Sequence, residues 1–164
     1  MFELMSPETF KKTLCVGNDG RLLERAWQME FYHAARQLLP KNVHISPDVG
    51  AVFASEGWVD FYVDDKHDWM IELVRDGEDL ENHRRKMKDD GLYGSILKCA
   101  KHHAIMDIRS GIGRLHNLKS GVIYVVCSQD FSSVEICINS IWDKVWLCGS
   151  RDLYTELGIS VTSY

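Results

Sequence analysis

The sequence lacks the features that mark several large classes of protein. Its longest apolar runs have the length of a β-strand, whereas a membrane-spanning helix needs about 20 apolar residues, so no transmembrane span is predicted. Residues 1–12 contain no basic stretch followed by an apolar core, so no secretory signal is predicted there. There is no internal repeat, low-complexity tract or interdomain linker. The 164 residues are therefore expected to form a single domain.

Cysteine patterns typical of metal or disulfide frameworks are also missing. The five cysteines are an odd number and show no CxxC pair and no zinc-type spacing. Cys127 and Cys137 lie inside apolar runs, where a thiol acts as a small hydrophobic side chain. Reduced thiols and an intracellular site of action are the expectation. A cysteine hydrolase built on Cys127 or Cys148 is a further alternative, but no family signature supports it.

Charge is unevenly distributed along the chain. The net charge is −5, which argues against a protein that simply coats nucleic acid. Residues 75–119 contain ten Lys and Arg against seven Asp and Glu, a local +3, so the rest of the chain carries −8. Residues 56–79 contain nine carboxylates against two basic side chains. This arrangement suits a metal site beside a phosphate-binding surface, and it equally suits a solvated loop beside a solvated helix.

Hydrophobic periodicity predicts a mixed α/β domain, with a mixed central sheet flanked by helices. A core over about 22–127 is expected to follow an N-terminal extension (1–20, with a helix starting near Pro7) and to precede C-terminal strands and a tail (128–164). Because the loop at Asp64–Asp68 is short, the strands on either side of it should be antiparallel neighbours. The predicted order is helix, three strands, helix, strand and further strands, over Leu22–Leu39, Val43–Ser55, Gly57–Val63, Trp69–Val74, Asp79–Asp89, Ala104–Arg109, Gly121–Cys127, Val134–Ile138 and Ile141–Cys148.

Three carboxylates occupy informative positions in this pattern. Glu30 falls within the apolar stripe of the long helix, which is formed by Leu23, Ala26, Trp27, Ala34 and Leu38. A charge on such a face must be paired or must bind a metal. Asp60 and Glu72 lie on the two strands of the predicted hairpin. The three acids are predicted to gather around a magnesium ion. The alternatives are an acidic hairpin surface and a buried salt bridge from Glu30 to Arg84 or Arg109.

The order helix-Glu, strand-Asp, strand-Glu resembles the restriction-endonuclease-like superfamily with its PD-(D/E)XK signature. The resemblance implies an αβββαβ core, Mg²⁺ (or Mn²⁺) bound by Glu30, Asp60 and Glu72, and hydrolysis of DNA phosphodiesters. The signature lysine is missing, because Val74 stands at its position. Since this lysine migrates to the following helix in some members, Lys86 or Arg84 is a candidate substitute. A degenerate, inactive site is the alternative.

A longer match covers residues 57–93 and resembles a cassette in nuclease-like C-terminal domains of Crinkler-type proteins of fungi and oomycetes. That resemblance implies an effector that acts in the nucleus of a host cell after secretion of the full-length protein. The NTPase domain associated with such proteins is not in this chain, which has no GxxxxGK[ST] motif. The matching positions are Gly57, Asp60, Phe61, Trp69, Glu72, Leu73, Arg75, Gly77, Leu80, His83, Met87, Gly91 and Tyr93.

Two further groups of side chains complete the predicted site. His83 is expected to contact phosphate or water, although a solvated histidine on a charged helix is the plainer interpretation. Basic side chains that would contact nucleic-acid phosphates are Arg75, Arg84, Arg85 and Lys88, and the same charges would also keep a helix soluble.

Two functions follow from these observations, and Val74 separates them. The first is a Mg²⁺-dependent endonuclease that acts on DNA, with Glu30, Asp60, Glu72, His83 and Lys86 in its active site. The second is a catalytically inactive domain of the same fold that binds nucleic acid or a protein partner. A homodimer is compatible with either function, and no membrane partner is expected.

Overall fold

The computed structural model describes residues 1–13, 23–64, 66–110, 115 and 117–146. Within these residues the helices are η1 (Phe2–Leu4), α1 (Pro7–Thr13), α2 (Glu24–Leu38), η2 (Ala51–Phe53), α3 (Leu80–Lys86) and α4 (Gly94–Leu97). The strands are β1 (Ile45–Val49), β2 (Val59–Val63), β3 (Trp69–Arg75), β4 (His102–Ser110), β5 (Val122–Cys127), β6 (Ser133–Ile138) and β7 (Ile141–Trp146).

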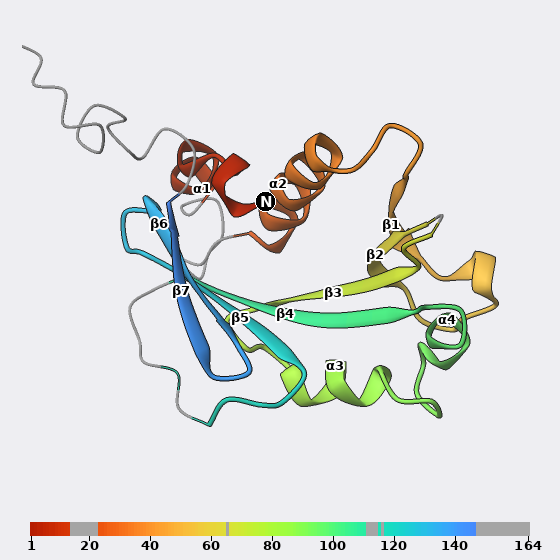
Figure 1. Ribbon diagram of the computed structural model, residues 1–164. Coiled ribbons are helices and arrows are strands. Elements are labelled where there is room, and N and C mark those ends of the chain that lie inside the picture. The colour runs from red at the N-terminus through yellow and green to blue at the C-terminus, as the bar shows by residue number, and fades with distance from the viewer. Residues whose placement is uncertain (14–22, 65, 111–114, 116, 147–164) are drawn as a thin grey trace, which may run out of the picture.

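The described strands form one seven-stranded mixed sheet whose spatial order follows the sequence, from β1 to β7. β1, β2 and β3 are antiparallel neighbours, β3, β4 and β5 run parallel, and β5, β6 and β7 are again antiparallel. A parallel pair needs a crossover connection, which α3 and α4 supply between β3 and β4. Figure 1 shows α1 and α2 on one face of the sheet and α3 and α4 on the other. The predicted mixed α/β architecture is confirmed.

Alternation of side chains along the strands builds two apolar layers, one on each face of the sheet. On the α2 face, Phe31 of the helix stacks on Phe61 of β2, with 5.1 Å between ring centroids. On the α3 face, Val74 of β3 packs in a cluster that also contains Tyr93 and Ile96. Val74 is 2% exposed, so the position at which the signature lysine was expected is part of the core.

The clearest differences in extent between prediction and structure concern three elements. The irregular first strand is reduced to β1, which tolerates Pro47 because its only partner within the described sheet is β2. The second predicted helix ends at Lys86 instead of Asp89, because the chain turns back and the Tyr93 N–H donates to the Lys86 carbonyl over 3.1 Å. β4 is longer than predicted, since its parallel pairing with β3 begins at His102. None of the described helices has the length and apolarity needed to cross a membrane.

Candidate active site

β2 and β3 separate at one end, and two carboxylates occupy the gap. Their register runs from Val63 opposite Trp69 to Phe61 opposite Ile71. One residue further along, the Leu73 N–H donates to Asp60 Oδ2 over 2.6 Å, and the Asp60 N–H donates to Glu72 Oε2 over 3.4 Å. Side-chain oxygens therefore accept backbone hydrogen bonds in the place where the ladder would continue. This brings together the two acids predicted from the hairpin.

Asp60 is a half-buried carboxyl with an unusual protonation equilibrium. Burial and the neighbouring charge of Glu72 raise its pKa to about 7, and the charge of Glu24 acts in the same direction. Hydrogen bonds from the Leu73 N–H and from Gln28 lower the pKa, the latter through Gln28 Nε2 to Asp60 Oδ1 at 2.6 Å. Neighbouring carboxyls of which one raises the pKa of the other favour one shared proton or a bound cation.

Glu72 is almost fully buried, at 3% exposure, and two side chains hold its Oε1. The Tyr93 hydroxyl donates to this oxygen over 2.9 Å, and His83 Nδ1 lies 2.6 Å from it. Burial and the negative charges of Glu72 and Asp60 raise the pKa of Tyr93, so its hydroxyl stays a hydrogen-bond donor. Oε2 is left facing the Asp60 strand. The carboxylate is thus fixed in orientation before any ligand binds.

The approach of Tyr93 to Glu72 depends on glycine at position 57. A Cβ atom at Gly57 would lie 2.6 Å from ring carbon Cε1 of Tyr93, a distance that real Cβ contacts do not show. The turn that carries Tyr93 is as tightly packed, since a Cβ at Gly91 would lie 2.4 Å from the Arg85 carbonyl oxygen. Cassette residues distant in sequence, namely Gly57, Asp60, Glu72, His83 and Tyr93, therefore gather at one place.

The candidate side chains of α3 differ in what they contact. His83 makes the direct contact with Glu72. Lys86, one turn further along α3, places its ammonium nitrogen 5.9 Å from the centroid of the Tyr93 ring. Arg84 is directed elsewhere and pairs with Glu81 at 3.2 Å. Of the two proposed lysine substitutes, Lys86 is the one that contacts a side chain bonded to Glu72, namely Tyr93.

Glu30 does not lie at this site, which corrects the prediction for the helix. Its Oε2 accepts a hydrogen bond from the Ser6 N–H over 3.0 Å, so it holds the start of α1 instead of pairing with Arg84 or Arg109. Residues two apart on an α-helix point about 200° away from each other. Because Gln28 reaches Asp60, Glu30 faces almost the opposite direction. Gln28 is the α2 residue at the site.

The expected nucleic-acid contacts lie on or beside α3. Arg75 pairs with Glu78 at 2.8 Å, and Arg85 donates to Asn82 over 2.9 Å, while Lys88 is exposed. Both partners lie three residues away along the chain and are exposed or partly exposed, so the Arg75–Glu78 ion pair and the Arg85–Asn82 hydrogen bond are weak. The phosphate-binding role of these side chains stays a prediction.

Two side chains at the site were not assigned their roles from the sequence. Gln28 was not predicted because an uncharged amide does not by itself indicate a metal site, although it lies four residues after Glu24 and so shares its helical face. Tyr93 is one of the matching cassette positions, but the sequence assigned it no role at the site. Its signal was available, since a buried tyrosine hydroxyl usually has a hydrogen-bond partner.

The residues present can be tested for their fit to a magnesium ion. Among the described residues, no group of three or more His, Cys, Asp and Glu side chains is gathered that could hold a metal. Mg²⁺, however, is commonly held by one or two carboxylates together with waters and substrate phosphates. Asp60 and Glu72 provide such a pair of carboxylates. Asp60 is held from α2 and Glu72 from the α3 side, and the oxygen donors of both suit this ion in chemical type.

The two buried thiols do not form a competing site. Cys127 and Cys137 are each 1% exposed, as predicted. Burial raises the pKa of the Cys127 thiol, which keeps it protonated and unreactive. Cys148, the other cysteine considered as a nucleophile, lies outside the described residues.

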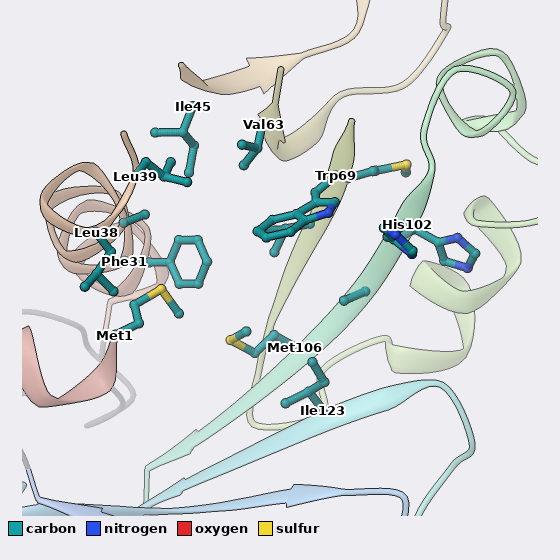
Figure 2. Close-up of a pocket in the computed structure, with 15 residues that line it drawn as sticks. Met1, Phe31, Leu38, Leu39, Ile45, Val63, Trp69, His102, Met106 and Ile123 are labelled. Atoms are coloured by element: carbon teal, nitrogen blue, oxygen red, sulfur yellow. The ribbon is translucent and has the colours of Figure 1, made fainter. Parts of the chain in front are cut away.

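A cavity lies at the end of the β2–β3 pair opposite to Asp60 and Glu72. Its volume is about 360 Å³, and Phe31 and Leu38 of α2 face Val63, Trp69 and Met106 of the sheet across it (Figure 2). Its lining contains no Asp or Glu. The cavity is therefore hydrophobic and separate from the acidic pair.

Comparison with known proteins gave no matching family model, no matching curated protein and no matching solved structure.

Proposed function

We propose that this chain is a metal-dependent nuclease domain with a restriction-endonuclease-like αβββαβ core, which hydrolyses DNA phosphodiester bonds. The observation that carries the proposal is the separation of β2 and β3 around Asp60 and Glu72. The element order supports it, because α2, the meander β1–β2–β3, α3 and the parallel strand β4 occur in the sequence expected for such a core.

The chemistry assigned to each residue follows from its position. Asp60 and Glu72 would hold Mg²⁺ or Mn²⁺, and the ion would supply Lewis-acid polarisation of the phosphodiester. Tyr93 and His83 keep Glu72 in place. Because Nδ1 of His83 is engaged by Glu72, Nε2 is the ring atom that would exchange a proton with the attacking water or contact the phosphate. Lys86 would contribute positive charge from the next turn of α3.

The cassette resemblance extends the proposal to biology. An effector acting in the nucleus of a host cell is the role that those residues suggest, and their convergence at one site is the support the chain offers for it.

A second function is favoured by one observation, the burial of Val74. With the signature position in the core, no lysine can act from β3. In that case the domain would be an inactive nuclease fold that binds nucleic acid or a protein through the same surface.

Plasmid relaxation separates the two functions. Supercoiled DNA is incubated with the full chain in Mg²⁺, in Mn²⁺ and in EDTA, and wild type is compared with Asp60→Asn. Asp143→Asn is the matched control, because Asp143 is exposed on β7. The proposal expects metal-dependent cleavage by wild type and by the control, with loss of at least 100-fold in Asp60→Asn. Binding without cleavage in every metal would establish the scaffold instead.

A further inference from the structure

A groove of about 250 Å³ opens beside Asp60 on the α2 face of the sheet. Asp60 belongs both to the lining of this groove and to the acidic pair. The helix residues that line it recur at the spacing i, i+3, i+4 and i+7, so they form one face of α2 directed at β1 and β2. The lining residues are Arg25, Gln28, Met29 and Tyr32 from α2, Pro47 from β1, and Asp60 and Phe61 from β2.

The groove is apolar and aromatic on its walls and polar at one end. Tyr32, Met29 and Pro47 supply the walls, and Met29 is 44% exposed although it is apolar. At the polar end, Arg25 donates to Gln28 Oε1 over 2.9 Å, and Gln28 Nε2 donates to Asp60 Oδ1. A flat group with apolar faces and a polar edge would match this surface.

The volume suits one nucleobase. A cavity of about 150 Å³ takes up benzene, which corresponds to about 25 Å³ for each ring atom, so a space of this size admits about ten heavy atoms. A purine ring system has nine ring atoms. A base that is paired and stacked in a duplex cannot enter a groove between a helix and a sheet, whereas an extruded or unpaired base can.

We propose that the groove is a subsite for one unpaired nucleobase next to the scissile phosphate, which makes single-stranded or locally unpaired nucleic acid the substrate class. The inference rests on the proposed function, since the acidic pair positions the phosphate to which the base is attached. Tyr32 is the stacking residue, and the polar end formed by Gln28 and Arg25 faces the edge of the base.

The test measures the affinity of the full chain for a 12-nucleotide single-stranded DNA with one central 2-aminopurine and for its duplex. Ca²⁺ replaces Mg²⁺, so that binding is measured with a carboxylate-binding ion present. Wild type should bind the single strand more tightly than the duplex and should change the 2-aminopurine fluorescence. Tyr32→Ala should weaken single-strand binding by roughly 5- to 100-fold, the value of one stacking contact. Tyr32→Phe should retain it.

Tyr32 is partly buried, so a second variant guards against a folding defect. Met29→Trp fills the groove from an exposed position and should abolish the preference for single strands while leaving duplex affinity within about twofold. Equal affinity of wild type for both DNAs, or equal weakening of both by Tyr32→Ala, would overturn the subsite.

The outcome can be told apart from failure of the nuclease proposal. Metal-dependent plasmid cleavage without any effect of Tyr32→Ala or Met29→Trp would remove the subsite and leave the nuclease. A loss of single-strand binding in both variants, with no cleavage in any metal, would retain the subsite on an inactive scaffold.

Discussion

Asp60 and Glu72 each accept a hydrogen bond from the backbone of the other's strand, Asp60 from the Leu73 N–H and Glu72 from the Asp60 N–H. Two acids in such a position weaken the hairpin, because they exchange backbone ladder bonds for side-chain bonds and place two negative charges together. A site that lowers stability is expected where a function requires it. This argues against a purely structural role for the pair.

Replacing Asp60 by Asn should stabilise the protein at neutral and alkaline pH. The folded-state pKa of about 7 lies above the usual value of about 4, so between these two values the folded chain binds a proton that the unfolded chain does not. The free energy of unfolding of wild type therefore falls as pH rises through this window and is level above it. Asp60→Asn lacks that decline. Its melting temperature should exceed that of wild type by roughly 3–8 °C at pH 8 and by little at pH 4.5.

Magnesium supplies the control for this experiment. At pH 8, millimolar MgCl₂ should raise the melting temperature of wild type, because a ligand that binds only the folded state stabilises it. Asp60→Asn should not respond, and Asp143→Asn should behave as wild type. A wild type whose melting temperature is independent of pH between 4.5 and 8 would contradict the electrostatic argument.

Removing the Tyr93 hydroxyl should weaken metal binding without removing a metal ligand. In Tyr93→Phe, Glu72 keeps only His83 at its Oε1, so the carboxylate is less well oriented. We expect roughly 10-fold lower affinity for Mn²⁺ by calorimetry, the usual effect of losing a group that orients a ligand. Tyr124→Phe is the matched control, since this buried hydroxyl accepts from the Lys119 N–H over 2.7 Å, in the same apolar cluster. Both variants should lose about 1 kcal/mol of stability, and only Tyr93→Phe should lose metal affinity.

The parts of this picture that the sequence predicted were those with a strong local signal. The alternation in β2 and β3, with a short loop between them, determines which residues are opposite one another, so Asp60 and Glu72 could be paired correctly. The long helix was harder, because its apolar stripe was taken to include Leu23 and Ala26, which are only half-buried and lie on the Glu30 side of Trp27. The buried residues are in fact Trp27, Phe31, Ala34 and Ala35. This rotated the expected face enough to select Glu30 in place of Gln28.

The contact between α3 and Glu72 depends on tertiary packing and was only partly predictable. The sequence indicated that Lys86 or Arg84 of this helix would reach the acids, but which side chain does so depends on how the helix is rotated over the sheet. Tyr93 packs closely against Gly57, which fixes the position of the turn after α3 and so contributes to that rotation. Neither residue propensity nor hydrophobic periodicity predicts such a contact.

Replacing Glu30 by Ala should lower stability, whereas replacing Gln28 by Ala should change catalysis. Glu30→Ala removes the acceptor for the Ser6 N–H and should cost about 1 kcal/mol of stability while leaving cleavage within about twofold. Gln28→Ala removes a hydrogen bond that lowers the pKa of Asp60. Its pH–rate profile should accordingly shift toward higher pH on the acidic limb. An equal loss of cleavage in both variants would show that Glu30 belongs to the active site.

The exposed face of α3 should carry affinity for DNA that does not depend on the metal site. In Arg84→Ala/Arg85→Ala/Lys88→Ala, three phosphate-neutralising charges are lost, so the slope of log K against log salt should flatten by about 2 to 3 for duplex DNA. Binding should weaken for all sequences alike, because phosphate contacts carry no sequence information.

The matched control is Lys11→Ala/Lys12→Ala/Lys41→Ala, which removes the same charge from exposed positions on and near the α1 and α2 face and should leave the slope nearly unchanged. Asp60→Asn should bind DNA as tightly as wild type or slightly more tightly, since a negative charge near the phosphates is gone. If the two triple variants lose DNA affinity equally, net charge alone would explain binding. DNA binding by wild type that does not depend on salt would point to a protein partner.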